Sequence, residues 1–223
     1  MPRSPWSRRL AAVASLGEET RRALFDYIRS AGRPVGRDEA AQAIGLTRGA
    51  AAAQLDRLAD EGVLTVTFAK AGAGGPGTGR PSKFYSPSRT EFVASVPERN
   101  YELVGELMAA AAERSMAEGT PIEESLEAAG RREGQKLGRE HASIHTVLDV
   151  AGYHPVPVPE GFELGNCPFH RLAQGHRGVV CSLSAALLEG ALDGCGDAAH
   201  SVEPIDPDVG PGECCARIVR TER

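Results

Sequence analysis

Two alanine-rich helical patterns, joined by a glycine turn within residues 36–63, constrain the fold of this chain more than any other feature of its sequence. The first pattern ends before Gly45, and Thr47 is suited to cap the start of the second. The apolar residues of both patterns recur at helical spacing, at Ala40, Ala41, Ile44, Leu55 and Leu58. A short helix, a tight glycine-bearing turn and a second helix are typical of a helix-turn-helix motif.

The segments on either side extend this motif into a winged fold. Residues 18–32 predict an amphipathic helix that ends at Gly32, a favourable C-cap position. Residues 62–70 and 82–88 have the composition of strands, and a glycine-rich segment separates them. We therefore expect residues 1–90 to form a winged helix-turn-helix domain.

Basic residues are concentrated in this front part of the chain. Residues 1–90 contain 14 Lys and Arg against 8 Asp and Glu, whereas the remaining residues contain 11 and 22. An excess of positive charge suits a polyanionic partner. Arginine and lysine can reach guanine or phosphate, and glutamine can reach adenine. The side chains predicted to contact double-stranded DNA are Thr47, Arg48, Gln54, Arg57, Lys70, Arg80 and Lys83.

Residues 91–150 predict a helical connector. A narrow, alanine-rich stripe runs along its first part, through Leu103, Leu107, Ala110 and Ala111. Such a stripe suits close helix packing within one chain or across a dimer axis. Because winged-helix repressors commonly bind two half-sites as symmetric dimers, we expect a homodimer that forms through this connector.

The sequence also predicts a cytoplasmic protein without membrane association. No segment approaches the roughly 20 apolar residues that a membrane span requires. The basic start and short apolar run of residues 1–17 mimic a secretion signal, but a patterned helix follows at once. Disulfides are rare in the cytoplasm, so the five cysteines, all within the last 57 residues, are interpreted as metal ligands or reactive thiols.

The spacing of these cysteines is wide. Cys167, Cys181, Cys195 and Cys214 are separated by 13, 13 and 18 residues, and Cys215 follows directly. Neither a zinc finger nor a thioredoxin has this spacing. The ligands of any metal centre must therefore be gathered by tertiary structure.

Local patterns predict how three of the cysteines lie. Cys167 follows a predicted strand and should project from an exposed corner. Cys181 should lie at or near the N-terminus of a helix, where the dipole lowers the pKa of a thiol. Cys214 should share the inner face of the last strand, because Ala216 and Ile218 alternate with it.

Four sequence fragments together resemble a known family. These are GRP.K.Y in the wing, NCPFH at 166–170, CSLSAALLEG at 181–190 and CC.RI near the end. They resemble the SUF-operon repressors (SufR-like), which are iron–sulfur winged helix-turn-helix transcriptional regulators, and in particular their actinobacterial members. The resemblance covers nearly the whole chain, and the cysteine arrangement is its most specific part.

This resemblance implies a dimeric repressor of iron–sulfur assembly genes whose three cysteines hold a 4Fe-4S cluster. The matching ligands are Cys167, Cys181 and Cys214, and Cys215 is an alternative to Cys214. Cys195 and His170 are further alternatives, and a set of three cysteines with His170 would favour zinc. Thiolates are soft ligands that suit either group.

The sequence thus predicts an α+β protein with three parts: a winged domain at 1–90, a helical connector at 91–150 and a cysteine-rich sensor domain at 151–223. We expect a regulator whose operator affinity is controlled by an iron–sulfur cluster. The alternatives are a regulator with a zinc site, a protein-docking module and a thiol-based enzyme. An enzyme is the least favoured, because no CxxC, nucleophile elbow or phosphate loop is present.

Overall fold

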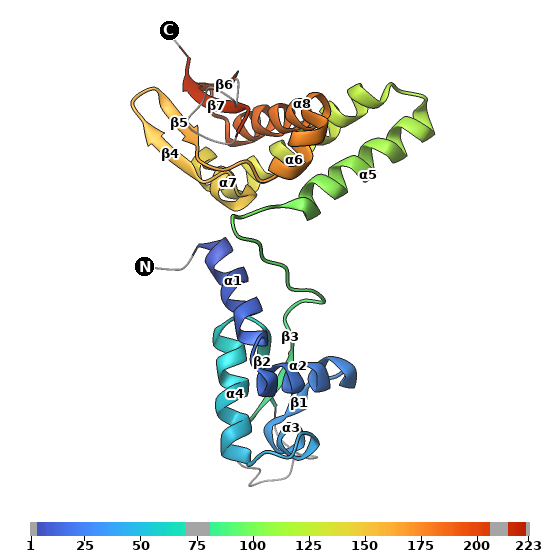
Figure 1. The fold of residues 1–223 in the computed structure, drawn as a ribbon, viewed down its shortest axis with the longest axis vertical. Coiled ribbons are helices and arrows are strands. Elements are labelled where there is room, and N and C mark those ends of the chain that lie inside the picture. Colours follow the sequence, from blue (N-terminus) through green and yellow to red (C-terminus); the bar gives the residue numbers. More distant parts are fainter. Residues whose placement is uncertain (1–3, 70–80, 206–213, 222–223) are drawn as a thin grey trace. The chain divides into compact units, whose positions relative to one another are not determined.

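Residues 4–69, 81–205 and 214–221 are described by a computed structural model of the chain, which contains both helices and strands (Figure 1). The chain divides into two units, Met1–Ala94 and Ser95–Arg223. Each unit combines helices with one small antiparallel sheet. The predicted α+β class is therefore confirmed.

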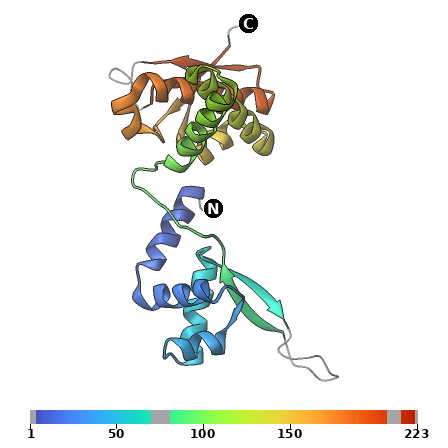
Figure 2. The same ribbon diagram turned by 90° about the vertical axis from the view of Figure 1, so that its right-hand side faces the viewer.

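The first unit contains four helices and three strands in its described residues. They are α1 (Pro5–Leu16), α2 (Glu19–Ala31), β1 (Val35–Gly36), α3 (Arg37–Ala43), α4 (Arg48–Asp60), β2 (Leu64–Ala69) and β3 (Ser82–Pro87). The strands pair antiparallel in the order β1-β3-β2. Figure 2 shows β2 and β3 as a two-stranded ribbon that extends from the helices of this unit.

Local signals account for the helix boundaries of this unit. Gly32 ends α2 in the left-handed conformation, with a φ of 62° that favours glycine. Thr47 caps α4, because its hydroxyl accepts a hydrogen bond from the backbone N–H of Ala50 at 3.3 Å. Gly45, with a φ of 72°, makes the turn between α3 and α4. The core consists of fully buried side chains, among them Leu24, Ile28, Leu55, Leu58 and Tyr85.

The second unit begins with helices and ends with a sheet. Its described elements are α5 (Tyr101–Glu118), α6 (Ile122–His141), α7 (Ile144–Ala151), β4 (Pro155–Val158), β5 (Gly161–Leu164), α8 (His170–Cys195), β6 (His200–Pro204) and β7 (Ala216–Arg220). The sheet order is β4-β5-β7-β6, with every neighbouring pair antiparallel. The last two strands, β6 and β7, thus lie side by side in the sheet.

A single hydrophobic core joins the predicted connector to the predicted cysteine domain. It combines Val104 and Leu107 of α5 and Leu148 of α7 with Leu183 and Leu187 of α8. Residues on both sides of the predicted division near residue 150 thus bury their apolar faces against one another. Much of the alanine-rich stripe on α5 is also used within the chain, because Leu107 is buried in this core.

The two longest helices of this unit, α6 and α8, approach one another backbone to backbone. A Cβ atom added at Gly134 would lie 2.0 Å from the carbonyl oxygen of Leu187. Comparable clashes would arise at the other contact glycines of the two helices, which are Gly130, Gly138, Gly190 and Gly194. This contact fixes α8 and, with it, the position of Cys181.

Within the described residues, α8 is the one helix whose length and composition would allow it to cross a membrane. Half of its apolar stretch is buried inside the second unit. Apolar residues of α8 thus supply side chains to the core of this unit.

Candidate functional site

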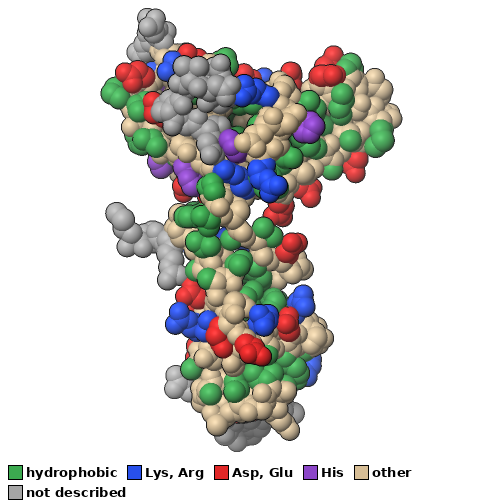
Figure 3. Space-filling model, viewed as in Figure 1, with side chains coloured by type: hydrophobic (Ala, Val, Ile, Leu, Met, Phe, Trp, Pro, Cys, Tyr) green, Lys and Arg blue, Asp and Glu red, His purple; other side chains and the backbone are tan. Residues whose placement is uncertain are grey.

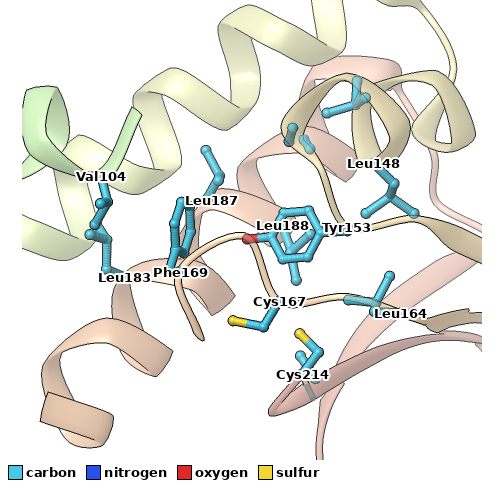
Figure 4. Close-up of a cluster of buried hydrophobic side chains, with 14 of the residues drawn as sticks. Val104, Leu148, Tyr153, Leu164, Cys167, Phe169, Leu183, Leu187, Leu188 and Cys214 are labelled. Carbon is cyan, nitrogen blue, oxygen red and sulfur yellow. The ribbon is translucent and has the colours of Figure 1, made fainter. Parts of the chain in front are cut away.

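Four of the five cysteine thiols of the second unit influence one another's pKa in neighbouring pairs. The Cys214 side chain acts on those of Cys167 and Cys215, and the Cys215 side chain also acts on that of Cys181. Figure 4 shows the side chains of Cys167 and Cys214 among the buried side chains of the core. We call these four residues the thiol cluster.

Three separate segments contribute to the thiol cluster. Cys167 lies in the turn between β5 and α8, Cys181 lies within α8, and the other two residues directly precede β7. Pairing of β5 with β7, with Phe162 opposite Ile218, brings the first and third segments together. The cluster is therefore a product of sheet register and of the packing of α8.

Buried polar contacts hold the turn that carries Cys167. The side-chain amide of Asn166 donates to the carbonyl oxygens of Glu98, at 2.9 Å, and Gly152, at 2.6 Å. Arg99 donates to the side-chain oxygen of Asn166 and, at 3.2 Å, to the carbonyl oxygen of Cys167. The sequence analysis did not identify this network, because its members lie up to 68 residues apart.

The structure corrects the predicted setting of Cys167, which does not project from an exposed corner, because the turn folds into the core and leaves only 2% of the residue exposed. Two helical segments meet within α8 at His176, whose backbone is not helical, so Cys181 lies near the start of the second segment, as predicted. Burial nevertheless raises the pKa of the Cys181 thiol, against the predicted effect of the helix dipole.

The prediction for the last strand holds. Cys214, Ala216 and Ile218 are all buried, with exposed fractions of 1%, 2% and 1%, whereas Cys215 is half-buried. Alternation along the strand explains this difference. Cys214 and Cys215 nevertheless both belong to the thiol cluster. Either one therefore stays a candidate for the third metal ligand.

The side chain of Cys214 separates the thiol cluster into groups of lowered and raised pKa. Its interaction with Cys167 lowers the pKa of that thiol, and its interaction with Cys215 lowers the pKa of Cys215 to about 6. The pKa of Cys214 is raised by these same interactions. Burial, followed by the interaction with Cys215, raises the pKa of Cys181 to about 12. Negative charge is thus favoured on the sulfurs of Cys167 and Cys215 and disfavoured on those of Cys214 and Cys181.

The two remaining candidate ligands lie in other hydrogen bonds. Cys195, at the end of α8, donates its thiol to the carbonyl oxygen of Gly138 at 3.7 Å, and burial raises its pKa. The ring of His170 hydrogen-bonds with the amide nitrogen of Gln174 at 3.1 Å. The described interactions therefore place Cys181, and not Cys195, beside Cys215.

The chemistry of the donor set fits an iron–sulfur cluster or zinc, because both take thiolates as ligands. In residues 4–69, 81–205 and 214–221, however, no three His, Cys, Asp or Glu side chains are arranged so that they could hold a metal ion. Loading a metal must displace the thiol protons, since thiolates are the binding form.

Some of the predicted DNA-contacting residues are exposed on the surface of the first unit, and others make hydrogen bonds within it. Arg48 and Arg57 lie exposed on α4, along with the small side chains of Ala50 and Ala53. Arg48 pairs with Asp38 at 2.9 Å, but both side chains are more than 70% exposed, so this pair contributes little to stability. Thr47 serves as the helix cap described above.

Two other predicted contacts make hydrogen bonds within the first unit. The side-chain oxygen of Gln54 accepts a hydrogen bond from Arg21 of α2 at 3.2 Å. The ammonium group of Lys83 bonds to Asp56 of α4 at 2.8 Å. Lys70 and Arg80, the other predicted wing cations, lie outside the described residues. On the face of this unit seen in Figure 3, basic side chains lie beside acidic ones.

Asp56 is the centre of a polar network that the sequence analysis missed. Its carboxylate accepts hydrogen bonds from Arg37 at 3.0 Å, Lys83 at 2.8 Å and the Tyr85 hydroxyl at 2.6 Å. Burial raises the pKa of Tyr85 to about 12, so its hydroxyl keeps the proton that it donates. The network joins α3, α4 and β3, and no local sequence pattern predicts it.

Replacing Asp56 with alanine should lower the free energy of unfolding of the first unit by about 2 kcal/mol, because the buried hydroxyl of Tyr85 loses its acceptor. Burial acts to raise the pKa of Asp56, but hydrogen bonds from Lys83 and Tyr85 outweigh it and lower the pKa. A carboxylate with a lowered folded pKa stabilises above its unfolded pKa of about 4, and this contribution is lost as the pH falls through the folded value.

Denaturant unfolding at pH 7 and pH 3 measures both effects. The wild-type chain should lose more stability between the two pH values than Asp56→Ala does. Asp60→Ala, an exposed change at the end of the same helix, should alter stability by less than about 0.5 kcal/mol. Equal acid sensitivity of Asp56→Ala and the wild type would contradict the role of this network.

No protein-family model matches this chain, no curated protein matches its sequence, and no solved structure matches it.

Proposed function

We propose that this protein is a DNA-binding transcriptional regulator whose operator affinity is controlled by an iron–sulfur centre held in the thiol cluster. The observation that carries the proposal is the convergence of four thiols from three distant segments. Cysteines that merely fill a core have no need to meet one another. The proposal agrees with the resemblance to SUF-operon repressors.

The arrangement of the first unit supports a winged helix-turn-helix for the DNA-binding part. A short α3, a turn at Gly45 and α4 are followed by the β2–β3 ribbon, and β1 completes the sheet. Exposed Arg48 and Arg57 flank the small side chains of Ala50 and Ala53 on α4. Small side chains permit close approach to a major groove, and the arginines supply contacts to guanine or phosphate.

The residues that would hold the iron–sulfur centre are Cys167, Cys181 and Cys214, with Cys215 as the alternative third ligand. Such a centre supplies oxidant-sensitive, redox-active iron. The chain contributes the burial of Cys167 and Cys214, which limits access of water to the sulfurs. Asn166 and Arg99 hold the turn that presents Cys167.

Zinc is the second candidate for the same site. Four cysteine thiols are also the donor set of a structural zinc site. A zinc regulator would keep the DNA-binding part of the proposal and lose redox sensing. In either case the metal joins the turn after β5, α8 and the segment before β7.

Control of DNA binding requires that the metal bind one conformation of the regulator more tightly than another. A metal with equal affinity for both conformations would not change the equilibrium between them. In this proposal the protein is a cytoplasmic homodimer, so that two α4 helices can meet two half-sites about 34–36 Å apart. The resemblance implies that the metal-loaded form is the repressor.

Anaerobic purification of the full chain, followed by an absorption spectrum and by iron, sulfide and zinc analysis, tests the proposal. We expect a coloured protein with iron and acid-labile sulfide in equal amounts, and loss of both in Cys167→Ser. A colourless protein with stoichiometric zinc would support the second candidate. Absence of iron, sulfide and zinc after reconstitution would refute a metal-controlled regulator.

Selection from a random pool of DNA duplexes tests the DNA-binding part separately. Arg57→Ala should weaken binding to the selected duplex by about 1–3 kcal/mol. Arg29→Ala, an exposed change on α2 where the arginine pairs with Asp26, is the matched control and should leave binding unchanged. Failure of the metal-loaded and metal-free chains to enrich any sequence would refute specific DNA recognition.

A further inference from the structure

We propose that the groove between α5 and α6 binds a second copy of this chain, so that two α5–α6 hairpins meet across a two-fold axis. This inference deepens the proposed function, because it rests on the homodimer proposed there and names the surface through which the two copies associate. It does not depend on the identity of the metal or of the operator.

The groove lies between α5 and α6 and has a volume of about 830 Å³. Its apolar lining consists of three alanines, Ala110, Ala117 and Ala128. Both alanines of α5 are exposed, and that of α6 is half-buried. Small side chains leave room for the larger side chains of another helix. The groove is thus an open, alanine-lined surface of the second unit.

The second half of α5 is not covered within the chain. The buried residues of this helix are Val104, Leu107 and Ala111, and none follows Ala111. Figure 1 shows the end of α5 and the start of α6 projecting from the rest of the second unit. This part of the chain therefore has a free side on which a second hairpin can pack.

The same hairpin also carries a side chain that suits the groove. Met116, next to Ala117 in the chain, is 79% exposed, more than any other large apolar side chain of the described residues. A flexible methionine adapts to irregular apolar gaps. In a two-fold interface, Met116 of each copy can enter the alanine-lined groove of the other.

The charges that line the groove are of both signs. Three arginines and two glutamates contribute to it, so the groove is close to neutral. A nucleic acid would favour a strongly basic surface. An interface that a two-fold axis relates to itself must instead contain both signs, because each patch meets its own copy. The composition of the groove therefore favours a second copy of this chain over a polyanion.

Two of these charged side chains are left for a partner. Arg114 pairs with Glu118 at 2.9 Å, and Arg131 pairs with carboxylates of α8. In the part of the chain that the structure describes, neither Glu113 nor Arg132 takes part in a salt bridge, and both are exposed. Glu113 lies on α5 and Arg132 on α6. Across a two-fold axis, Glu113 of each copy can pair with Arg132 of the other.

Sedimentation equilibrium of the full chain measures the dissociation constant of the homodimer and requires neither metal nor DNA. Each single reversal, Arg132→Glu or Glu113→Arg, should raise this constant at least about tenfold, because symmetry turns two attractive pairs into two repulsive ones. The matched control is Glu160→Arg, an exposed reversal in the turn between β4 and β5, which should leave the constant unchanged.

Combining the two reversals provides the sharpest measurement. A mixture of Arg132→Glu chains and Glu113→Arg chains should form heterodimers, which native mass spectrometry detects, because every pair again joins opposite charges. The double variant that carries both changes should recover self-association for the same reason. Folding defects in the single variants would not produce this recovery, and circular dichroism of each variant checks its fold.

Met116→Ala tests the apolar part of the same surface. Loss of a buried methionine from each copy should raise the dissociation constant at least about tenfold. Val156→Ala is the control, because it shortens a side chain on β4 that is 49% exposed, and it should leave the constant unchanged. Equal dissociation constants for Met116→Ala and Val156→Ala would overturn the assignment of Met116 to the interface.

A dimer that does not respond to the reversals at Glu113 and Arg132 would overturn this inference alone. So would weakened single variants that do not recover in the mixture or in the double variant. A chain that stays monomeric would overturn both this inference and the homodimer of the proposed function. The iron, zinc and DNA measurements of the preceding section are separate, so metal control can fail while this interface stands.

Discussion

Replacing Gly134 with alanine should destabilise the second unit by about 3 kcal/mol or more, a larger effect than most single substitutions produce. The added Cβ would lie 2.0 Å from the carbonyl oxygen of Leu187 and 2.7 Å from the backbone nitrogen of Ala191. Both atoms belong to the backbone of α8, so no side-chain rotation relieves the clash. The two helices must move apart, and the core that they share must open.

Hydrogen exchange of α8 peptides in the full chain measures this loss, because it reports the opening free energy of the second unit separately. The matched control is Gly105→Ala on α5, where an added Cβ meets no atom within 4 Å. Alanine there should stabilise by about 0.5–1 kcal/mol, since it has the higher helix propensity. Similar protection of α8 in Gly134→Ala and the wild type would contradict the close contact.

The same substitution links packing to the proposed site. Separation of α6 from α8 would displace Cys181, which α8 carries, away from Cys215. We therefore expect Gly134→Ala to lower the metal content of the reconstituted protein. Gly105→Ala should leave it unchanged.

Replacing Asn166 with alanine should cost the second unit about 3 kcal/mol. The side-chain amide is 3% exposed and satisfies the carbonyl oxygens of Glu98 and Gly152, while its oxygen accepts from Arg99. Alanine removes all three interactions at once. Buried carbonyl groups without donors cost about 1–3 kcal/mol each, although such costs do not add fully.

The effect should reach the thiol cluster, because Asn166 directly precedes Cys167. Denaturant unfolding of the second unit and iron content after reconstitution measure the two consequences. Asn100→Ala is the control: it removes the cap of α5, a 3.2 Å bond to the backbone of Leu103, and should cost only about 1 kcal/mol. A cost for Asn166→Ala no greater than for Asn100→Ala would show that the network does not hold the turn.

Several elements of this fold were predictable because their causes are local. The caps at Gly32 and Thr47 depend on a few adjacent residues, and the structure has both. Alternation along the last strand correctly placed Cys214 on its buried face. One local signal was overlooked: the four-residue spacing of Gly130, Gly134 and Gly138 places them on one face of a helix, which indicates close helix packing.

The error in the predicted site has a different cause. The turn at Cys167 has the composition of an exposed corner, but Asn166 and Arg99 anchor it inside the core. Gln54 and Lys83 stay predicted DNA contacts, and the structure adds hydrogen bonds from Arg21 to Gln54 and from Lys83 to Asp56. A sequence pattern cannot show which distant partner a polar side chain meets.

The sequence by itself determined where most helices and strands of the first unit begin and end, since propensity, capping and periodicity act within a few residues. It also determined that the cysteines are too widely spaced for a local metal motif. Only the tertiary structure decided that helices 101–151 share one core with the cysteine segments, and that four of five thiols meet. Those outcomes depend on strand register and on the approach of α6 to α8, which join residues tens of positions apart.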